Sequence, residues 1–193
     1  MNRLSRSKLY LALLHYPVKN KDGKAIASAI TSIDLHDIAR TARTYGVAGF
    51  YVVTPLADQR EFAGKIISHW VEGAGAAYNP DRKKAFSLIR LRSELQEAID
   101  EIRVEGENEV RVVATSASGG PGQLEFADLR QALKTGQRSY VVALGTAWGL
   151  TPRFMEKADY RLAPVAGMSD YNHLSVRAAA AIILDRLLAA DLQ

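Results

Sequence analysis

Three ionisable side chains that lie close together in the sequence could carry acid–base or anion-binding chemistry. His36 and Asp37 are candidate proton acceptors, and Arg40 keeps its positive charge at physiological pH. All three fall within Ile33–Tyr45, where apolar residues recur at helical spacing. A simpler interpretation is a surface ion pair between Arg40 and Asp37. The segment therefore predicts a helix with a candidate catalytic cluster and leaves open which residue would act.

Three segments that contain Gly, Ser or Pro follow predicted strands and could surround a flat ligand. They are Thr115–Gly122, Leu144–Leu150 and Leu162–Gly167. Glycine lets a backbone approach a ligand closely, so the N–H and C=O groups of these bends could bind a ring. A tight turn shaped by Gly145 and Gly149, without any ligand, is the alternative. A phosphate loop of the Walker type is disfavoured because the sequence Gly-Lys-Ser/Thr is missing.

A polar run opens the last predicted helix, Asn172–Leu188. Asn172 could cap the free backbone N–H groups of this helix or contact a ligand, and the sequence does not distinguish the two. His173 could stack on a ligand or bind it through a hydrogen bond, although isolated histidines are more often structural. Ser175 belongs to the same run, which is therefore a fourth candidate contact region.

The segment from Tyr78 to Arg82 is an aromatic and basic turn. Tyr78 could stack on a nucleic-acid base, and Asn79 and Arg82 could hold phosphate. An ordinary Asn-Pro turn explains the same residues equally well.

The composition excludes several kinds of site. None of the 193 residues is cysteine, which excludes disulfides, thiolate nucleophiles and Cys-based zinc sites. The four histidines lie far apart and form no metal-binding motif, so we expect no metal. A net charge of +4 and a pI of about 9.3 are compatible with a polyanionic partner, but are weak indicators alone.

The N-terminal segment carries no signal for a membrane. Met1–Lys8 is basic, and the apolar run after it covers only Leu9–Leu14, which is too short for a signal peptide or a bilayer span. We expect a basic arm leading into the first strand, no membrane anchor and a cytoplasmic location.

Strand and helix signals alternate along the chain. Continuous apolar runs predict strands buried on both faces, and helical periodicity predicts helices between them. The expected strands are Leu9–His15, Val47–Val53, Ala85–Leu91, Val110–Ala114, Ser139–Leu144 and Asp159–Ala163. The expected helices are Ile33–Tyr45 (capped by Asp34), Asp58–Val71, a helix from Ser93 to about Val104, Phe126–Leu133, Pro152–Met155 and Asn172–Leu188, with a long loop at Pro17–Ser32 and a turn at Gly106–Asn108.

This alternation predicts an α/β fold, with one domain over residues 1–193 and a parallel sheet covered by helices on both faces. In such sheets ligands bind beyond the carboxyl ends of the strands. The three glycine-containing bends follow strands at that edge, so the fold and the candidate residues agree.

The order and spacing of the three bends resemble the cofactor loops of the SPOUT superfamily of RNA methyltransferases. Asp37–Gly46, followed by a strand and Pro55, resembles the first motif of that superfamily, with Arg40 as the motif's arginine. The segments His36–Arg40 and Tyr171–Ala178 together are similar to a bacterial SPOUT family of unassigned substrate, sometimes found beside or fused to tRNA guanine-N1 methyltransferase.

The resemblance implies an S-adenosylmethionine-dependent methyltransferase acting on tRNA or rRNA. It implies a C-terminal trefoil knot that holds the cofactor, and a homodimer paired through the C-terminal helix. Knots are nearly absent from proteins otherwise, so this expectation rests on the resemblance alone. The residues implied to bind the cofactor are Thr115, Ser116, Leu144, Gly145, Thr146, Gly149, Leu150, Leu162, Pro164, Val165, Gly167, Asn172, His173, Leu174 and Ser175. The implied catalytic residues are Arg40, Asp37 and His36, and the implied RNA contacts are Arg40, Tyr78, Asn79 and Arg82.

The sequence departs from the superfamily's pattern at two points. His173 stands where many members have Asn, and Asp34, His36 and Asp37 replace the usual Asn and Gly before the arginine. These departures leave the methylated atom and the catalytic base open. A non-catalytic RNA-binding or regulatory protein that keeps the knot fold is therefore the alternative, and an ordinary nucleotide-binding α/β protein is a second.

Overall fold

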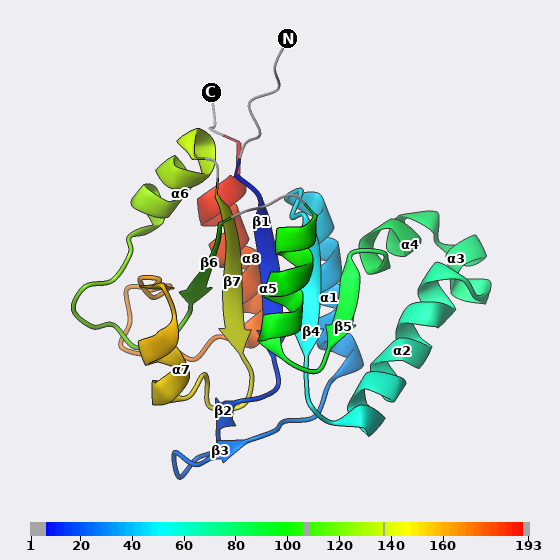
Figure 1. Ribbon diagram of the computed structural model, residues 1–193, viewed down its shortest axis with the longest axis horizontal. Coiled ribbons are helices and arrows are strands. Elements are labelled where there is room, and N and C mark those ends of the chain that lie inside the picture. Colours follow the sequence, from blue (N-terminus) through cyan, green and yellow to red (C-terminus); the bar gives the residue numbers. More distant parts are fainter. Residues whose placement is uncertain (1–6, 106–108, 137, 191–193) are drawn as a thin grey trace.

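The centre of the molecule is a six-stranded sheet (Figure 1). The computed structural model describes residues 7–105, 109–136 and 138–190. Most of the basic arm expected at Met1–Lys8, and the turn expected at Gly106–Asn108, lie outside these residues. Within the six-stranded sheet, all pairings of the described strands are parallel, and the strand order is β5-β4-β1-β7-β6-β8. The strands are β1 (Leu9–Leu14), β4 (Gly49–Val53), β5 (Ile89–Arg92), β6 (Val110–Ala114), β7 (Ser139–Gly145) and β8 (Tyr160–Arg161).

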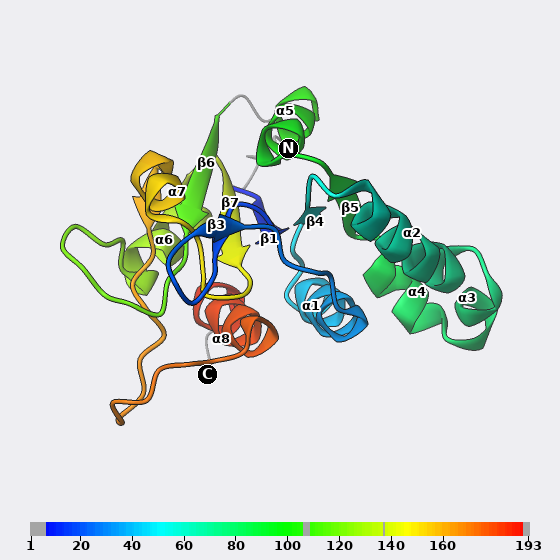
Figure 2. The ribbon, with the colours of Figure 1, turned by 90° about the horizontal axis from the view of Figure 1, so that it is seen from below.

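Two buried apolar clusters, one on each face of the sheet, form the core. Alternate residues of β1 divide between them, because successive side chains of a strand point to opposite faces. Helices pack against both clusters and so cover both faces of the sheet (Figure 2). This arrangement confirms the predicted α/β fold with two helical layers. One layer contains α1 (Ser32–Thr44), α2 (Ala57–Val71), α4 (Pro80–Phe86), α6 (Phe126–Thr135) and α8 (Val176–Leu188), and the other contains α5 (Leu95–Val104) and α7 (Pro152–Lys157).

None of the helices in the described part of the chain combines the length and the apolarity that a bilayer crossing requires.

Two helices begin at residues other than expected, because a nearby hydroxyl caps them. The Thr31 hydroxyl accepts the backbone N–H of Asp34 at 3.4 Å, so Thr31 rather than Asp34 is the N-cap of α1. The Ser175 hydroxyl accepts the N–H of Ala178 at 3.3 Å and caps α8. Asn172 therefore precedes the last helix and does not cap it.

The region between β4 and β5 is more helical than predicted. α2 is followed by α3 (Ala74–Tyr78), and the Asn79 side chain then accepts the N–H of Arg82 at 2.9 Å to cap α4. The strand expected at Ala85–Leu91 is wrong in its first half, because β5 begins only at Ile89. A capping Asn followed by Pro at the first helical position is a helix start as well as a turn. Together, α2, α3 and α4 form an arm beside the β5 edge of the sheet (Figure 1).

The predicted loop at Pro17–Ser32 contains a small antiparallel pair. β2 (Val18–Lys19) pairs with β3 (Ala25–Ile26), and Val18 also forms a bridge to Leu150. Strands of two residues are too short to produce a recognisable alternation of apolar and polar residues. This hairpin lies at the carboxyl edge of the sheet, where it contacts the second of the three bends (Figure 1).

Candidate functional site

The three bends leave the carboxyl ends of neighbouring strands. The first follows β6, the second follows β7, and the third follows β8. The Thr115 hydroxyl and N–H both donate to the Ala143 carbonyl of β7, at 2.9 and 3.2 Å. The Leu162 N–H donates to the Ala114 carbonyl of β6 at 2.9 Å. These bonds continue the parallel ladder beyond the strands, so the bends begin side by side at one edge of the sheet.

Hydrogen bonds join the third bend and the segment after it to the first bend and to Leu124, which follows it. The Leu124 N–H donates to the Arg161 carbonyl at 2.8 Å, and the Ala163 N–H donates to the Leu124 carbonyl at 2.9 Å. The Asn172 side-chain amide donates to the Ala117 carbonyl at 2.8 Å. The segment that leads into α8 is therefore tied to the first bend through a residue that the sequence offered as a helix cap or a ligand contact.

The second bend folds tightly back on itself. An added Cβ at Gly145 would lie 2.7 Å from the Leu150 nitrogen and 3.0 Å from the Gly149 carbonyl carbon, so only glycine permits this close approach. Gly149 has a φ of 89°, and Ala147 has a φ of 50°, which is unusual for a residue with a side chain. These glycines therefore shape a tight turn, and the choice between a turn alone and a cofactor loop stays a prediction.

The predicted cofactor residues differ in how much side chain they expose. Leu144, Leu150 and Leu162 are buried in the two core clusters, so they offer a ligand mainly their backbone groups. Thr146 is also buried. The others are partly or fully exposed, namely Thr115, Ser116, Gly145, Gly149, Pro164, Val165, Gly167, Asn172, His173, Leu174 and Ser175.

A chain of three polar side chains, of which His15 and Thr146 are buried and Ser28 is partly buried, supports the second bend. His15, directly after β1, has its Nδ1 atom 3.0 Å from the Ser28 hydroxyl, which lies 2.5 Å from the Thr146 hydroxyl. The Thr146 hydroxyl also donates to the Leu14 carbonyl at 3.1 Å. Sequence reasoning missed His15 and Ser28. The signal available was a polar ring placed directly after a fully buried apolar run, which requires a buried partner.

Burial controls the ionisation of His15. Its side chain is inaccessible to solvent, and its Nε2 atom has no hydrogen-bond partner among the described residues. Burial lowers the pKa of His15 from 6.5 to about 4, and the opposing attraction of Asp34 is smaller. The imidazole is therefore neutral at physiological pH and acts as a hydrogen-bonding support for the bend.

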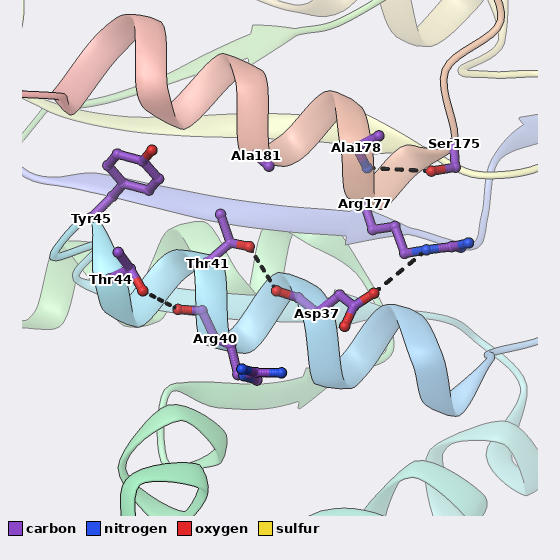
Figure 3. Close-up of a pocket in the computed structure, with 9 residues that line it drawn as sticks. All are labelled: Asp37, Arg40, Thr41, Thr44, Tyr45, Ser175, Arg177, Ala178 and Ala181. Atoms are coloured by element: carbon purple, nitrogen blue, oxygen red, sulfur yellow. Dashed lines mark hydrogen bonds and ion pairs between the residues drawn. The ribbon is translucent and has the colours of Figure 1, made fainter.

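A groove of about 580 Å³ lies between α1 and α8 (Figure 3). Asp37 and Arg40, both predicted to be catalytic, line it together with Ser175 and Arg177. Arg40 stands at the rim and its side chain points away from α8 (Figure 3). Ser175 links this groove to the third bend through the chain segment that ends at α8.

An ion-paired arginine connects the two helices of the groove. The Arg177 guanidinium lies 3.3 Å from an Asp34 carboxylate oxygen. It also lies 3.5 Å from an Asp37 carboxylate oxygen (Figure 3). Asp34 is buried and also accepts the Thr31 hydroxyl at 2.6 Å. Arg177 therefore fixes both the start of α8 and the Asp37 carboxylate.

His36 does not share this groove with Asp37 and Arg40. Its ring packs edge-on against Phe86 and Trp70, with centroid distances of 4.6 and 5.4 Å. Burial, and secondarily the charge of Arg82, lower the pKa of His36. The structure thus places His36 in an aromatic contact between α1 and the α2–α4 arm.

The residues of the aromatic and basic turn have different structural roles. Arg82 lies over the Trp70 ring, 4.3 Å from its centroid, and Asn79 caps α4. Tyr78 is 88% exposed. Of the three predicted RNA contacts in this turn, only Tyr78 has its side chain free in solvent.

Comparison with known proteins identifies the family. Residues 8–189 match the family described as SAM-dependent RNA methyltransferase. The chain therefore belongs to the SAM-dependent RNA methyltransferases.

Two curated relatives are longer than this chain. It is 43% identical over 180 residues to a protein of Oleidesulfovibrio alaskensis and 44% identical over 187 residues to one of Nitratidesulfovibrio vulgaris, both named tRNA (guanine-N(1)-)-methyltransferase. These matches cover 93% and 97% of the chain but only 42% and 43% of the relatives. An uncharacterised protein of Aquifex aeolicus is 40% identical and is covered to 89% of its length, against 95% of this chain.

Solved structures of RNA methyltransferases share the fold. The SpoU methyltransferase AviRb from Streptomyces viridochromogenes, in complex with AdoMet, aligns with a TM-score of 0.55 at 20% identity, over 95% of this chain and 58% of that one. The TrmH/SpoU tRNA modifying enzyme of A. aeolicus aligns with a TM-score of 0.52 at 20% identity, over 95% and 75% of the two chains. These structures support the SPOUT fold, while the threading of the predicted knot stays a prediction.

The buried His15 predicts a specific loss of stability in acid. Between pH 6.5 and 4 the unfolded state binds a proton that the native imidazole does not, so the free energy of unfolding falls as the pH falls. The expected loss is about 3 kcal/mol at pH 4. Urea unfolding over a pH series measures it, and His15→Gln should remove this part of the slope.

The exposed His173 provides the matched control for this measurement. His173→Gln should leave the acid slope of the wild type in place. An unchanged slope in His15→Gln would show that the acid sensitivity has another origin.

Proposed function

We propose that the chain binds S-adenosylmethionine in the three bends and catalyses methyl transfer to RNA. The observation that carries this proposal is the convergence of the bends at the carboxyl edge of β6, β7 and β8. At Gly120, Gly149 and Gly167 an added Cβ would meet no atom within 4 Å, so the bends border open space that a ligand can enter. Backbone groups, buried leucines and the fixed Thr146 match the needs of a nucleoside.

The residues of the groove supply the other part of the chemistry. When bound, S-adenosylmethionine supplies an activated methyl group, so the protein mainly positions the acceptor and helps to remove its proton. Arg40 has no ion-pair partner among the described residues, and we assign it to an RNA phosphate or a negatively charged acceptor. Asp37, held by Arg177, is the candidate base. His36 packs against Phe86, so we assign it to supporting the α2–α4 arm rather than to catalysis.

We propose RNA as the substrate class and leave the methylated base open. More than half of each longer relative lies outside its match to this chain. The activity in the names of those relatives can therefore belong to the part that the match does not cover. The family match covers nearly the whole chain, and its description names RNA methylation without specifying the nucleotide base. A cytoplasmic location accompanies an RNA substrate.

We further propose a homodimer paired through α1 and α8. The small side chains of Ala178 and Ala181 line the open groove, where a second helix can approach closely. Met168, Tyr171 and Leu174, in the segment before α8, expose apolar surface. An interface between two copies would cover both features.

The tight approach at Gly145 provides a test of cofactor binding. Gly145→Ala must displace the Leu150 backbone, so calorimetry should show at least about a tenfold loss of affinity for S-adenosylhomocysteine, which corresponds to about 1.4 kcal/mol. Gly64→Ala, on α2 and outside the three bends, is the matched control, because its Cβ would make only an ordinary contact, 3.9 Å from a Leu91 side-chain carbon. Wild-type affinity in Gly145→Ala would contradict the assignment of the second bend.

Methyl transfer is tested with labelled S-adenosylmethionine and total RNA from a strain that lacks the gene. The RNA should become labelled, and Arg40→Ala should reduce the labelling at least tenfold while affinity for S-adenosylhomocysteine is kept. Arg43→Ala, an exposed arginine on the same helix but outside the groove, is the control. RNA that is retained but never labelled would instead support the non-catalytic RNA-binding protein.

A charge placed in the groove tests the dimer. Ala181→Glu should convert the dimer into a monomer, because two copies would bury like charges at the paired helices. Light scattering after size exclusion measures the mass. Ala77→Glu, at an exposed alanine of the arm, should remain dimeric, and a wild-type monomer at high concentration would refute the pairing.

A further inference from the structure

An exposed tryptophan stands at the tip of the second bend. Trp148 is 64% exposed, whereas Trp70, the other tryptophan, packs against His36 and Phe86. The positive φ angles of Ala147 and Gly149 on either side turn the backbone so that residue 148 projects from the bend. A large aromatic ring held in solvent on a turn with two positive φ angles is a candidate contact for a ligand.

The β2–β3 hairpin holds this bend in place. The Lys19 N–H donates to the Gly149 carbonyl at 2.8 Å, and the Trp148 N–H donates to the Lys19 carbonyl at 3.1 Å. The bridge between Val18 and Leu150 continues the same pairing. The backbone that carries the indole is therefore fixed on both sides and needs little ordering when a ligand binds.

The hairpin brings positive charge to the tryptophan. Lys19 is partly exposed, and Lys21 and Lys24 are exposed in the turn between β2 and β3. The Asn20 side chain accepts the N–H groups of Asp22 and Lys24, at 3.0 and 2.9 Å, so this turn is ordered. Among the ion pairs of the described residues, none involves these three lysines.

We propose that Trp148 and the hairpin lysines Lys19, Lys21 and Lys24 form a platform for single-stranded RNA. An unpaired base stacks on the indole, and the neighbouring phosphates bind the ammonium groups. A duplex hides the faces of its bases, so it would use the lysines without the tryptophan. The exposed lysines of the hairpin favour a polyanion over an apolar protein partner.

The position of the platform relates it to the reaction. Trp148 belongs to the bend that we assign to the cofactor, so an RNA strand stacked there passes beside the methyl donor. This relation rests on the proposed function, whereas stacking itself does not. Tyr78 ends α3 in the arm beside the β5 edge, whereas Trp148 belongs to the bend after β7, so the two exposed rings lie on different parts of the molecule (Figure 1).

The test measures binding of a fluorescein-labelled single-stranded RNA of about eight nucleotides, a length within known site sizes. Trp148→Ala in the full chain should weaken binding about 5- to 150-fold, and Trp148→Phe should keep most of the affinity because phenylalanine also stacks. Tyr78→Ala should leave the affinity within twofold. Addition of RNA should quench tryptophan emission in the wild type and not in Trp148→Phe, which separates direct stacking from misfolding.

Two lysine pairs of equal charge test the phosphate contacts. The double variant Lys21→Ala/Lys24→Ala should lower the slope of log affinity against log salt by about 1.4, or 0.7 for each lost phosphate contact. Lys83→Ala/Lys84→Ala on α4 makes the same change in net charge and should leave the slope unchanged.

The outcomes separate the platform from the enzyme. Wild-type RNA affinity in Trp148→Ala, equal use of a duplex, or a larger loss in Tyr78→Ala would each overturn the platform, even if S-adenosylhomocysteine binds. If Trp148→Ala loses RNA affinity while the wild-type protein binds no S-adenosylhomocysteine, the platform is supported and the proposed cofactor site is refuted.

Discussion

The parallel pairing of β8, β6 and β7 is the constraint on which the candidate site depends. Strands that run in the same direction deliver the segments that follow them to the same edge of the sheet. β8 pairs through only Tyr160 and Arg161, and the hydrogen bonds of Leu162 and Ala163 to β6 and Leu124 extend this short strand. This extension helps to hold the third bend beside the first bend.

The two parts of the site differ in how firmly the fold holds them. The bends are fixed by backbone hydrogen bonds, by the polar chain from His15 to Thr146, and by the β2–β3 hairpin. The groove between α1 and α8 is open, and the ion pairs of Arg177 are its main cross-connection. Rigidly held bends for a nucleoside cofactor, beside a groove whose rim carries Arg40 for the RNA, suit the methyl transfer that we propose.

The sequence predicted the sheet well because apolar runs buried on both faces leave a strong signal, as at Leu9–Leu14 and Val110–Ala114. It failed where one polar side chain decides a boundary, as Asn79 does for α4 and Ser175 for α8. The bends could be predicted because glycine marks them. The contacts of His15 with Ser28, and of Lys19 with Gly149, join residues far apart in the sequence, and no local pattern encodes them.

Hydrogen exchange of backbone amides, with and without S-adenosylhomocysteine, tests the central claim most directly. One ligand that sits in all three bends should slow exchange together in residues 115–122, 144–150 and 162–175. The α2–α4 arm should exchange at the same rate in both states. Protection confined to a single bend, or found only away from the carboxyl edge of the sheet, would contradict a shared cofactor site.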